Sequence, residues 1–302
     1  MSLEKNNISA LKKGDAVAVI STARKVRPSE LDFAINKIKS WGLNVCFGKN
    51  LFKQDHQFAG TIKERVEDLQ WALDDVNIKA VFFARGGYGS VHVVDSVDWQ
   101  TFRTNPKLLI GFSDITVFHS HVHQCFNIPT LHAAMPITYP QNTDLAIKNI
   151  RDILFGEKVS YKFKGHSFNK NGKVKANIVG GNLSILFSLL GSKSQLNTDG
   201  KILFLEDLDE YLYHIDRMMQ ALKRAGMLEN LSGLIIGGMS GMNDNTIPFG
   251  KTAEEIIRDV VSEYTYPVAF DIPAGHINEN LPLLFGKKVN FSVATNQVLI
   301  RL

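Results

Sequence analysis

Short apolar segments alternate with segments of helical periodicity through the first half of the chain, and this alternation constrains the fold most strongly. The segments expected to form buried strands are residues 15–21, 43–47, 80–84, 108–110 and 130–132. Helices are expected from Pro28 to about Trp41, over residues 62–74 and over residues 115–125. Strands that alternate with helices predict a mostly parallel sheet with helices on both faces. Ligands bind to such sheets beyond the carboxyl ends of the strands.

The pattern changes after about Pro140. A helix is expected over residues 142–155, and residues 159–176 are polar, rich in Lys, Asn and Gly, and predict an exposed connection with short strands. Further on, expected strands and helices mix with more turns, and residues 289–302 predict a closing hairpin. We therefore predict an N-terminal α/β domain over residues 1–158, a connection over 159–176 and a smaller C-terminal α/β domain over 177–302.

The composition excludes several classes of protein. The net charge of the 302 residues is only +4 and the basic residues are scattered, so we expect no nucleic-acid-binding surface and no membrane patch. Cys46 and Cys125, the only cysteines, cannot form a disulfide scaffold or a cysteine-based zinc site. No stretch approaches the ~20 apolar residues of a membrane span. Residues 1–15 carry charges where a signal peptide needs an apolar core, so we expect a cytoplasmic protein.

The segment Leu108–Thr116, with the sequence LLIGFSDIT, carries the first candidate for chemistry. Its pattern predicts a buried strand that ends at a tight turn and leads into a helix. A turn of this kind displays a serine side chain at the end of a sheet. If Ser113 is a nucleophile, the chain must also supply a base, a group that orients the base and hydrogen-bond donors for an oxyanion.

Glu206 and His276 are candidates for the acid and the base. Glu206 ends an apolar run, and His276 follows a Pro-Ala-Gly turn after an expected strand, where polar side chains are displayed. A structural role is equally open to both, for Glu206 as a helix cap. Ser113, Glu206 and His276 occur in the chain order of the α/β-hydrolase triad, but the serine turn lacks the second glycine of GxSxG. From these residues alone, the triad is one hypothesis among several.

Three histidines lie on the helix expected after the serine. Of these, His119 and His123 share one helix face and could bind a metal ion, but no HExxH pattern accompanies them. We therefore favour a solvated or interface face for this pair and expect no metal site.

The segment RGGYGS at residues 85–90 directly follows an expected strand. Its backbone N–H groups could cradle a phosphate, although the spacing fits neither GxGxxG nor the P-loop. Alternatively, Gly86 and Gly87 let the backbone approach a substrate carbonyl and donate to an oxyanion. A purely structural tight turn is the third alternative.

Five sequence blocks taken together carry a resemblance to a known family. They are RGGYGS at 85–90, GFSDIT at 111–116, GGNLSIL at 180–186, LFLEDLDEYLYHIDRMMQAL at 203–222 and GHINENLPLLFGKKV at 275–289. In this order they resemble the LD-carboxypeptidase family of serine peptidases, which includes murein tetrapeptide carboxypeptidases and microcin-C immunity hydrolases. The resemblance implies a flavodoxin-like N-terminal α/β domain and a swivelling-type C-terminal domain, with the site at their junction. It also implies a homodimer and no metal or other cofactor.

The resemblance assigns roles to individual residues. It implies that Ser113 is the nucleophile, Glu206 the acid and His276 the base. The backbone amides of the Gly86–Gly87 turn and of Asp114 would form the oxyanion hole. One departure is visible at residues 132–136, where this chain has HAAMP and many relatives have HGP. Alanine takes positive φ less easily than glycine, so this affects the expected local backbone but not the triad.

The implied substrate is a murein tetrapeptide, from which a terminal D-amino acid is released by hydrolysis of an L,D-amide bond in cell-wall recycling. A substrate carboxylate needs a cation nearby, and Arg85, Tyr88 and Arg217 are candidates for substrate contacts, although for mid-helix Arg217 we favour pairing with a carboxylate. A rival hypothesis is an immunity-type hydrolase of peptidyl- or aminoacyl-nucleotide antibiotics. Those relatives carry an aromatic-bearing loop, whereas residues 114–205 here contain no tryptophan. A non-catalytic nucleotide or sugar-phosphate binding protein is the third hypothesis.

Overall fold

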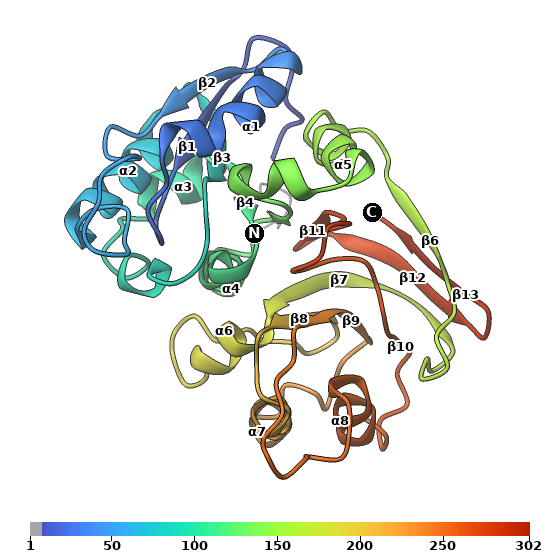
Figure 1. Ribbon diagram of the computed structural model, residues 1–302. Helices are drawn as coiled ribbons and strands as arrows, with labels where there is room; N and C mark the ends of the chain where they lie inside the picture. Colours follow the sequence, from blue (N-terminus) through green and yellow to red (C-terminus); the bar gives the residue numbers. More distant parts are fainter. Residues whose placement is uncertain (1–7) are drawn as a thin grey trace.

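The computed structural model describes residues 8–302, which form two β-sheets with helices packed on them (Figure 1). The expectation that the chain has no signal peptide falls partly on residues 1–7, which lie outside the described residues. No helix formed by residues 8–302 combines the length and the hydropathy that a membrane crossing needs.

The first sheet contains five parallel strands and one antiparallel strand. Its strand order is β11-β5-β4-β3-β1-β2, so the five parallel strands follow the flavodoxin-like order 2-1-3-4-5. The strands are β1 (Ala16–Ile20), β2 (Asn44–Phe47), β3 (Ile78–Phe83), β4 (Leu108–Gly111), β5 (Thr130–His132) and β11 (Leu283–Phe285). The predicted parallel sheet in the N-terminal part is thus confirmed.

Helices cover both faces of this sheet, as a parallel sheet requires. On one face lie α1 (Pro28–Ser40), the 3₁₀ helix η4 (Pro136–Gln141) and α5 (Asp144–Leu154). The other face is covered by α2 (Ile62–Asp74), α3 (Gln100–Thr104) and α4 (Thr116–Phe126). Two short 3₁₀ helices, η2 (Ser90–His92) and η3 (Ser113–Ile115), follow β3 and β4.

Local sequence signals set several helix ends. Thr61 begins α2 with a capping box, in which its hydroxyl accepts from the Glu64 N–H and the Glu64 carboxylate accepts from the Thr61 N–H at 2.8 Å. The predicted helix over residues 62–74 therefore has the observed bounds. A second capping box, between Thr252 and Glu255, begins α8 (Ala253–Val260).

The second sheet has seven strands in the order β10-β9-β8-β7-β12-β13-β6. Its strands are β6 (Ser160–Lys164), β7 (Gly172–Asn182), β8 (Ile202–Leu208), β9 (Gly233–Ser240), β10 (Val268–Ala269), β12 (Lys288–Ala294) and β13 (Gln297–Arg301). Strands β7 to β10 are parallel, and the predicted hairpin of β12 and β13 adds antiparallel pairs. One face is covered by α6 (Leu183–Ser188), α7 (Leu212–Arg224) and α8.

The short strands expected within residues 159–176 are present as β6 and the first residues of β7, and both belong to this sheet. The Lys and Asn side chains of this stretch alternate with smaller or apolar ones, and such alternation suits strands with one solvated face. The domain bounds at residues 158 and 177 remain a prediction.

The short strand β11 joins the two halves of the chain, and the sequence pattern did not predict it. Leu283 and Phe285 pair with His132 and Thr130 of β5 in antiparallel register. The same segment packs on the second sheet, because Leu283 and Phe285 belong to the apolar cluster that includes Phe204 of β8. One three-residue strand therefore belongs to the first sheet by hydrogen bonds and to the core of the second by packing (Figure 1).

We predict that Phe285→Ala lowers the free energy of unfolding by about 3–5 kcal/mol, because a buried aromatic ring is lost from between the two sheets. Urea denaturation followed by circular dichroism measures the change. Val76→Ala is the control, since Val76 is 61% exposed and its truncation should change stability by less than about 0.5 kcal/mol. A loss below 1 kcal/mol for Phe285→Ala would contradict the joining role of β11.

Candidate active site

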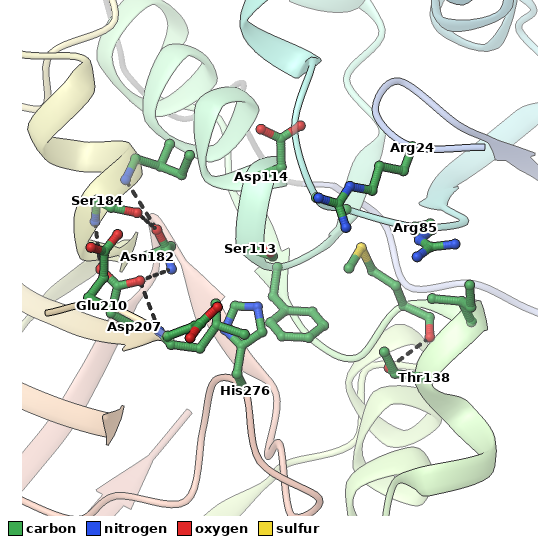
Figure 2. Close-up of a pocket in the computed structure, with 18 of the residues that line it drawn as sticks. Arg24, Arg85, Ser113, Asp114, Thr138, Asn182, Ser184, Asp207, Glu210 and His276 are labelled. Atoms are coloured by element: carbon green, nitrogen blue, oxygen red, sulfur yellow. Dashed lines mark hydrogen bonds between the residues drawn. The ribbon is translucent and has the colours of Figure 1, made fainter. Parts of the chain in front are cut away.

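A cavity of about 730 Å³ lies where the carboxyl ends of strands from both sheets meet (Figure 2). Segments that follow β1, β3 and β4 line it from the first sheet, and the ends of β7 and β8 line it from the second. The lining residues bearing polar or charged side chains are Arg24, Arg85, Ser113, Asp114, Thr138, Gln141, Asn182, Ser184, Asp207, Asp209, Glu210 and His276. The position agrees with the rule that ligands bind beyond the carboxyl ends of parallel strands.

Ser113 follows β4 in a conformation that few residues other than glycine adopt. Its φ is +62°, in the left-handed region, where a side chain costs roughly 1 kcal/mol or more. The chain then enters η3 and α4, so the serine lies on a strand-turn-helix element although GxSxG is absent. The strained backbone and the position in the cavity are what a displayed nucleophile requires.

The RGGYGS turn lies directly against this serine. A methyl group placed on Gly86 would be 3.1 Å from Cβ and 3.3 Å from Oγ of Ser113. Gly87 has a φ of +109°, and a methyl group there would be 2.6 Å from Cδ of Arg24. Gly86 therefore allows the backbone to approach the serine closely, and Gly87 leaves room for the side chain of Arg24. The structure thus brings the two predicted oxyanion glycines and Ser113 together.

The side chain of Asp114 holds the RGGYGS turn in place. Its buried carboxylate accepts a 2.8 Å hydrogen bond from the Ser90 N–H, at the end of RGGYGS. Burial raises the pKa of Asp114, while the bonds from Ser90 and Gly89 and the charge of Arg65 oppose the rise. Figure 2 shows the carboxylate directed away from His276, so only the backbone of Asp114 is available to the cavity.

His276 and Glu206 form a hydrogen-bonded pair. Nδ1 of His276 lies 2.7 Å from Oε2 of Glu206, which also accepts the His276 backbone N–H at 3.2 Å. Glu206 is fully buried at the end of β8, and Gly275, with a φ of +109°, allows the close approach, because a methyl group there would be 2.6 Å from the same Oε2. The pair occupies Nδ1, so Nε2 of His276 is the ring nitrogen left for the cavity.

The groups around His276 set its pKa. Burial alone would lower its pKa, but attraction to Glu206, the hydrogen bond between them and the charge of Asp207 outweigh burial, so the pKa is raised above the ordinary 6.5. The ring also packs on Phe112, with centroids 4.7 Å apart. His276 therefore has a raised pKa and a fixed ring orientation.

Asn182 and Asp207 form a second polar pair that we did not assign a role from sequence. The Asn182 amide donates to Oδ1 of Asp207 at 2.8 Å, and its Oδ1 caps α6 at the Ile185 N–H. The Asn182 backbone N–H donates to Oγ1 of Thr116 at 3.0 Å, which ties the start of α4 to the end of β7. Burial, followed by the charge of Glu206, raises the pKa of Asp207 to about 7.

Other expected site residues lie elsewhere. Tyr88 does not line the cavity; its hydroxyl is 3.3 Å from Nε2 of His92 and its ring packs on Phe58. Arg217 lies over the ring of Tyr213, also outside the cavity. Arg24 and Glu210 line the cavity, but the sequence did not predict this, because no local motif marks either residue.

His119 and His123 are buried, so of the two expected alternatives, a solvated or an interface face, the solvated one is wrong. Burial lowers the pKa of each to about 4, and His119 packs on Phe285 of β11. Within residues 8–302, no three His, Cys, Asp or Glu side chains are grouped so as to hold a metal ion.

We predict that the pKa of His276 lies above 6.5 and that Glu206→Gln lowers it below 6.5, because burial then acts without the opposing charge. Titration of the histidine Cε1–H signals by NMR measures both values, and His276→Gln identifies the signal. Glu157→Gln, which removes an exposed charge outside the cavity, should leave the value unchanged. An unchanged pKa in Glu206→Gln would contradict the pairing.

Comparison with known proteins identifies relatives of the whole chain. Residues 17–133 match the LD-carboxypeptidase N-terminal domain, and residues 175–291 match the LD-carboxypeptidase C-terminal domain. The "Probable murein peptide carboxypeptidase" of Bacillus subtilis (strain 168) is 32% identical, over 96% of this chain and 93% of its own length. The murein tetrapeptide carboxypeptidase of Pseudomonas aeruginosa is 26% identical, over 90% of this chain and 91% of its own.

Solved structures share the fold. The muramoyltetrapeptide carboxypeptidase from Oxalobacter formigenes superposes with a TM-score of 0.87 at 24% identity, over 95% of this chain and 98% of that one. The microcin C7 self immunity protein MccF superposes with a TM-score of 0.86 at 20% identity, over 97% of this chain and 98% of that one. At these identities the likeness concerns the fold alone. The matched segments and the Bacillus relative together show that this chain belongs to the LD-carboxypeptidase family.

Proposed function

We propose that this protein is a serine carboxypeptidase that releases the terminal D-amino acid of a murein tetrapeptide by hydrolysing an L,D-amide bond. The observation that carries the proposal is the 2.7 Å hydrogen bond from His276 to buried Glu206, made beside a cavity that Ser113 and His276 both line. The names of the Bacillus and Pseudomonas relatives support the murein substrate.

In the proposed reaction, Nε2 of His276 accepts the hydroxyl proton of Ser113 while Oγ attacks the carbonyl carbon of the amide. Glu206 holds the imidazole in the required tautomer and stabilises the imidazolium that forms. The N–H groups of Gly86, Gly87 and Asp114 are the proposed donors to the oxyanion, an effect of about 3 kcal/mol per donor in other enzymes.

Collapse of the tetrahedral intermediate breaks the C–N bond, and His276 returns the proton to the leaving amine. The shortened peptide remains as an ester of Ser113. A water molecule then attacks this ester, with His276 accepting a proton from the water and passing it to Ser113 as the acyl group leaves. The products are the free D-amino acid and the shortened peptide. No step uses a metal or a cofactor.

Cleavage of a peptidyl- or aminoacyl-nucleotide, suggested by the resemblance to immunity-type hydrolases, is the alternative for the same residues. One neighbour in fold, the microcin C7 self immunity protein MccF, is solved in complex with aspartyl sulfamoyl adenosine. The absence of tryptophan between residues 114 and 205 favours the murein peptide. We further propose that the enzyme acts in the cytoplasm as a homodimer, as the resemblance implies.

We predict that Ser113→Ala lowers the rate of D-alanine release from an L,D-tetrapeptide by at least about 10³-fold, because the nucleophile is lost. Release is measured by coupled D-amino-acid oxidation, with the D,D-linked peptide as a substrate control. Asn77→Ala, on the loop before β3 and outside the cavity, is the matched control and should retain the wild-type rate.

Wild-type activity should also survive EDTA. Release by Ser113→Ala at the wild-type rate would refute the serine mechanism, and loss of activity in EDTA would refute the metal-free reaction. If wild-type protein cleaves only an aminoacyl-nucleotide and no tetrapeptide, the alternative function replaces the proposal.

A further inference from the structure

Four neighbouring strands of the second sheet carry basic side chains on one side. They are β6, β13, β12 and β7, each antiparallel to the next (Figure 1). Lys162 of β6 is opposite Leu299 of β13. Leu299 is opposite Ser292 of β12, which is opposite Lys173 of β7. Residues paired in this way point to the same side of a sheet, as do residues two positions apart in one strand.

This register collects six basic residues on one side of the four strands, which we call the basic face. They are Lys162, Lys164, Lys173, Lys175, Lys288 and Arg301. All six side chains are exposed. The four strands contain no Asp or Glu, and none of the six residues forms an ion pair within residues 8–302. The positive charge of the basic face is therefore not neutralised in the described part of the chain.

The other side of the same strands is apolar. Side chains that alternate with the basic ones, among them Tyr161, Phe291 and Ile300, are buried in the cluster that also contains Phe285 of β11. Helices α7 and α8 cover the side of the basic face, but they pack over Val179 and the strands that follow it in the sheet. The basic face is thus the part of this sheet side that the helices leave open.

The basic face also makes the charge distribution of the molecule asymmetric. The net charge of the whole chain is +4, and the six residues alone carry more than this, so the rest of the chain is slightly negative. Basic residues are scattered along the sequence, which is why no membrane patch was expected, but strand pairing gathers six of them from four segments. Such a distribution orients a protein with one side toward an anionic surface.

We infer that the basic face binds an anionic lipid surface, so that the protein attaches to a membrane without crossing it. Four strands present a face about 15 Å wide and about 20 Å long, which suits a flat partner. Lysine carries its charge on a flexible stem and requires no fixed geometry of its partner, as lipid headgroups demand. None of the large apolar side chains exposed in the described chain lies on these strands, so the attachment is electrostatic and depends on salt.

Two other partners fit the basic face less well. Surfaces that bind single-stranded nucleic acid add aromatic side chains for base stacking, and readers of duplex DNA insert a helix or a ribbon into a groove. The aromatic residues of β6, Tyr161 and Phe163, instead pack on the apolar side. A second copy of the chain on the same face would bring like charges together.

The inference does not depend on the proposed function, because none of the six residues lines the cavity. Its first test uses wild-type protein and sedimentation with vesicles of phosphatidylcholine alone or of phosphatidylcholine mixed with phosphatidylglycerol. The protein should bind the mixed vesicles and not the neutral ones. Raising the salt from ~0.1 M to ~1 M shortens the screening length from ~10 Å to ~3 Å, so binding should fall at least about tenfold.

A triple variant assigns the binding to the basic face. Lys162→Gln, Lys173→Gln and Lys175→Gln together should lower the affinity for mixed vesicles roughly 100-fold, because each charge near an anionic surface contributes roughly fivefold. Arginine at the same three positions keeps the charge and should keep the affinity. A melting curve shows that each variant is folded, and release of D-alanine from a soluble tetrapeptide should proceed at the wild-type rate in both.

A second triple variant is the matched control. Lys39→Gln, Lys53→Gln and Lys63→Gln remove the same charge from exposed positions on the first half of the chain, outside the cavity. Its affinity for mixed vesicles should stay within about twofold of wild type if the basic face, and not net charge, causes the binding.

Several results would overturn the inference. Wild-type protein that binds neither kind of vesicle, or both equally, has no electrostatic attachment to anionic lipid. Equal losses in the two glutamine variants would assign the binding to net charge alone. If wild-type protein binds a DNA or RNA oligonucleotide more tightly than mixed vesicles, and the variant of the basic face loses this binding, the partner is a nucleic acid. If light scattering shows a dimer that the same variant dissociates, the face is an interface between copies.

Discussion

The antiparallel pairing of β11 with β5 is the contact on which the assembled site depends. Ser113 follows β4 of the first sheet, Glu206 lies on β8 of the second, and His276 lies in the loop between β10 and β11, so neither sheet alone contains the three residues. β11 follows His276 by only a few residues in the chain, and its pairing with β5 fixes the His276 loop beside β4 and the serine turn. The hydrogen bond from Asn182 to Thr116 adds a second tie between the sheets, next to α4. The position of Ser113 relative to His276 is therefore a property of the fold.

Backbone conformation determines much of the remaining geometry of the site. Ser113 takes a positive φ, Gly86 and Gly87 leave space for the serine and for Arg24, and Gly275 allows His276 to reach Glu206. At Gly86, Gly87 and Gly275 the main chain lies so close to Ser113, Arg24 and Glu206 that an added Cβ would crowd these side chains. The cost is local strain at Ser113, which the buried hydrogen bond between Asp114 and Ser90 helps to hold in place.

Sequence reasoning predicted the features that have local causes. The apolar spacing over residues 62–74 predicted α2, whose start the capping box at Thr61 explains, and the alternation of strands and helices predicted the parallel sheet. Ser113, Glu206 and His276 could be named as candidates because each ends or follows an apolar strand. β11 was not predicted, because three apolar residues show no periodicity and their partner strand, β5, lies far away in sequence. The place of Arg24 and Glu210 in the cavity was not predicted for a similar reason, since the two residues line one cavity only because the two sheets meet. The polar composition of residues 159–176 predicted short strands in an exposed stretch, but it carried no sign of the sheet to which β6 and β7 belong.

We propose that Ser113, which follows β4, and His276, in the loop between β10 and β11, act as one catalytic unit. Comparing kcat for Ser113→Ala, for His276→Ala and for the double variant on an L,D-tetrapeptide tests it most directly. If the two residues act together, either single substitution removes the whole of their joint effect, and the double variant is no slower than the slower single variant. If the losses in the two single variants multiply in the double variant, the residues act independently, and the account of a shared proton transfer is contradicted.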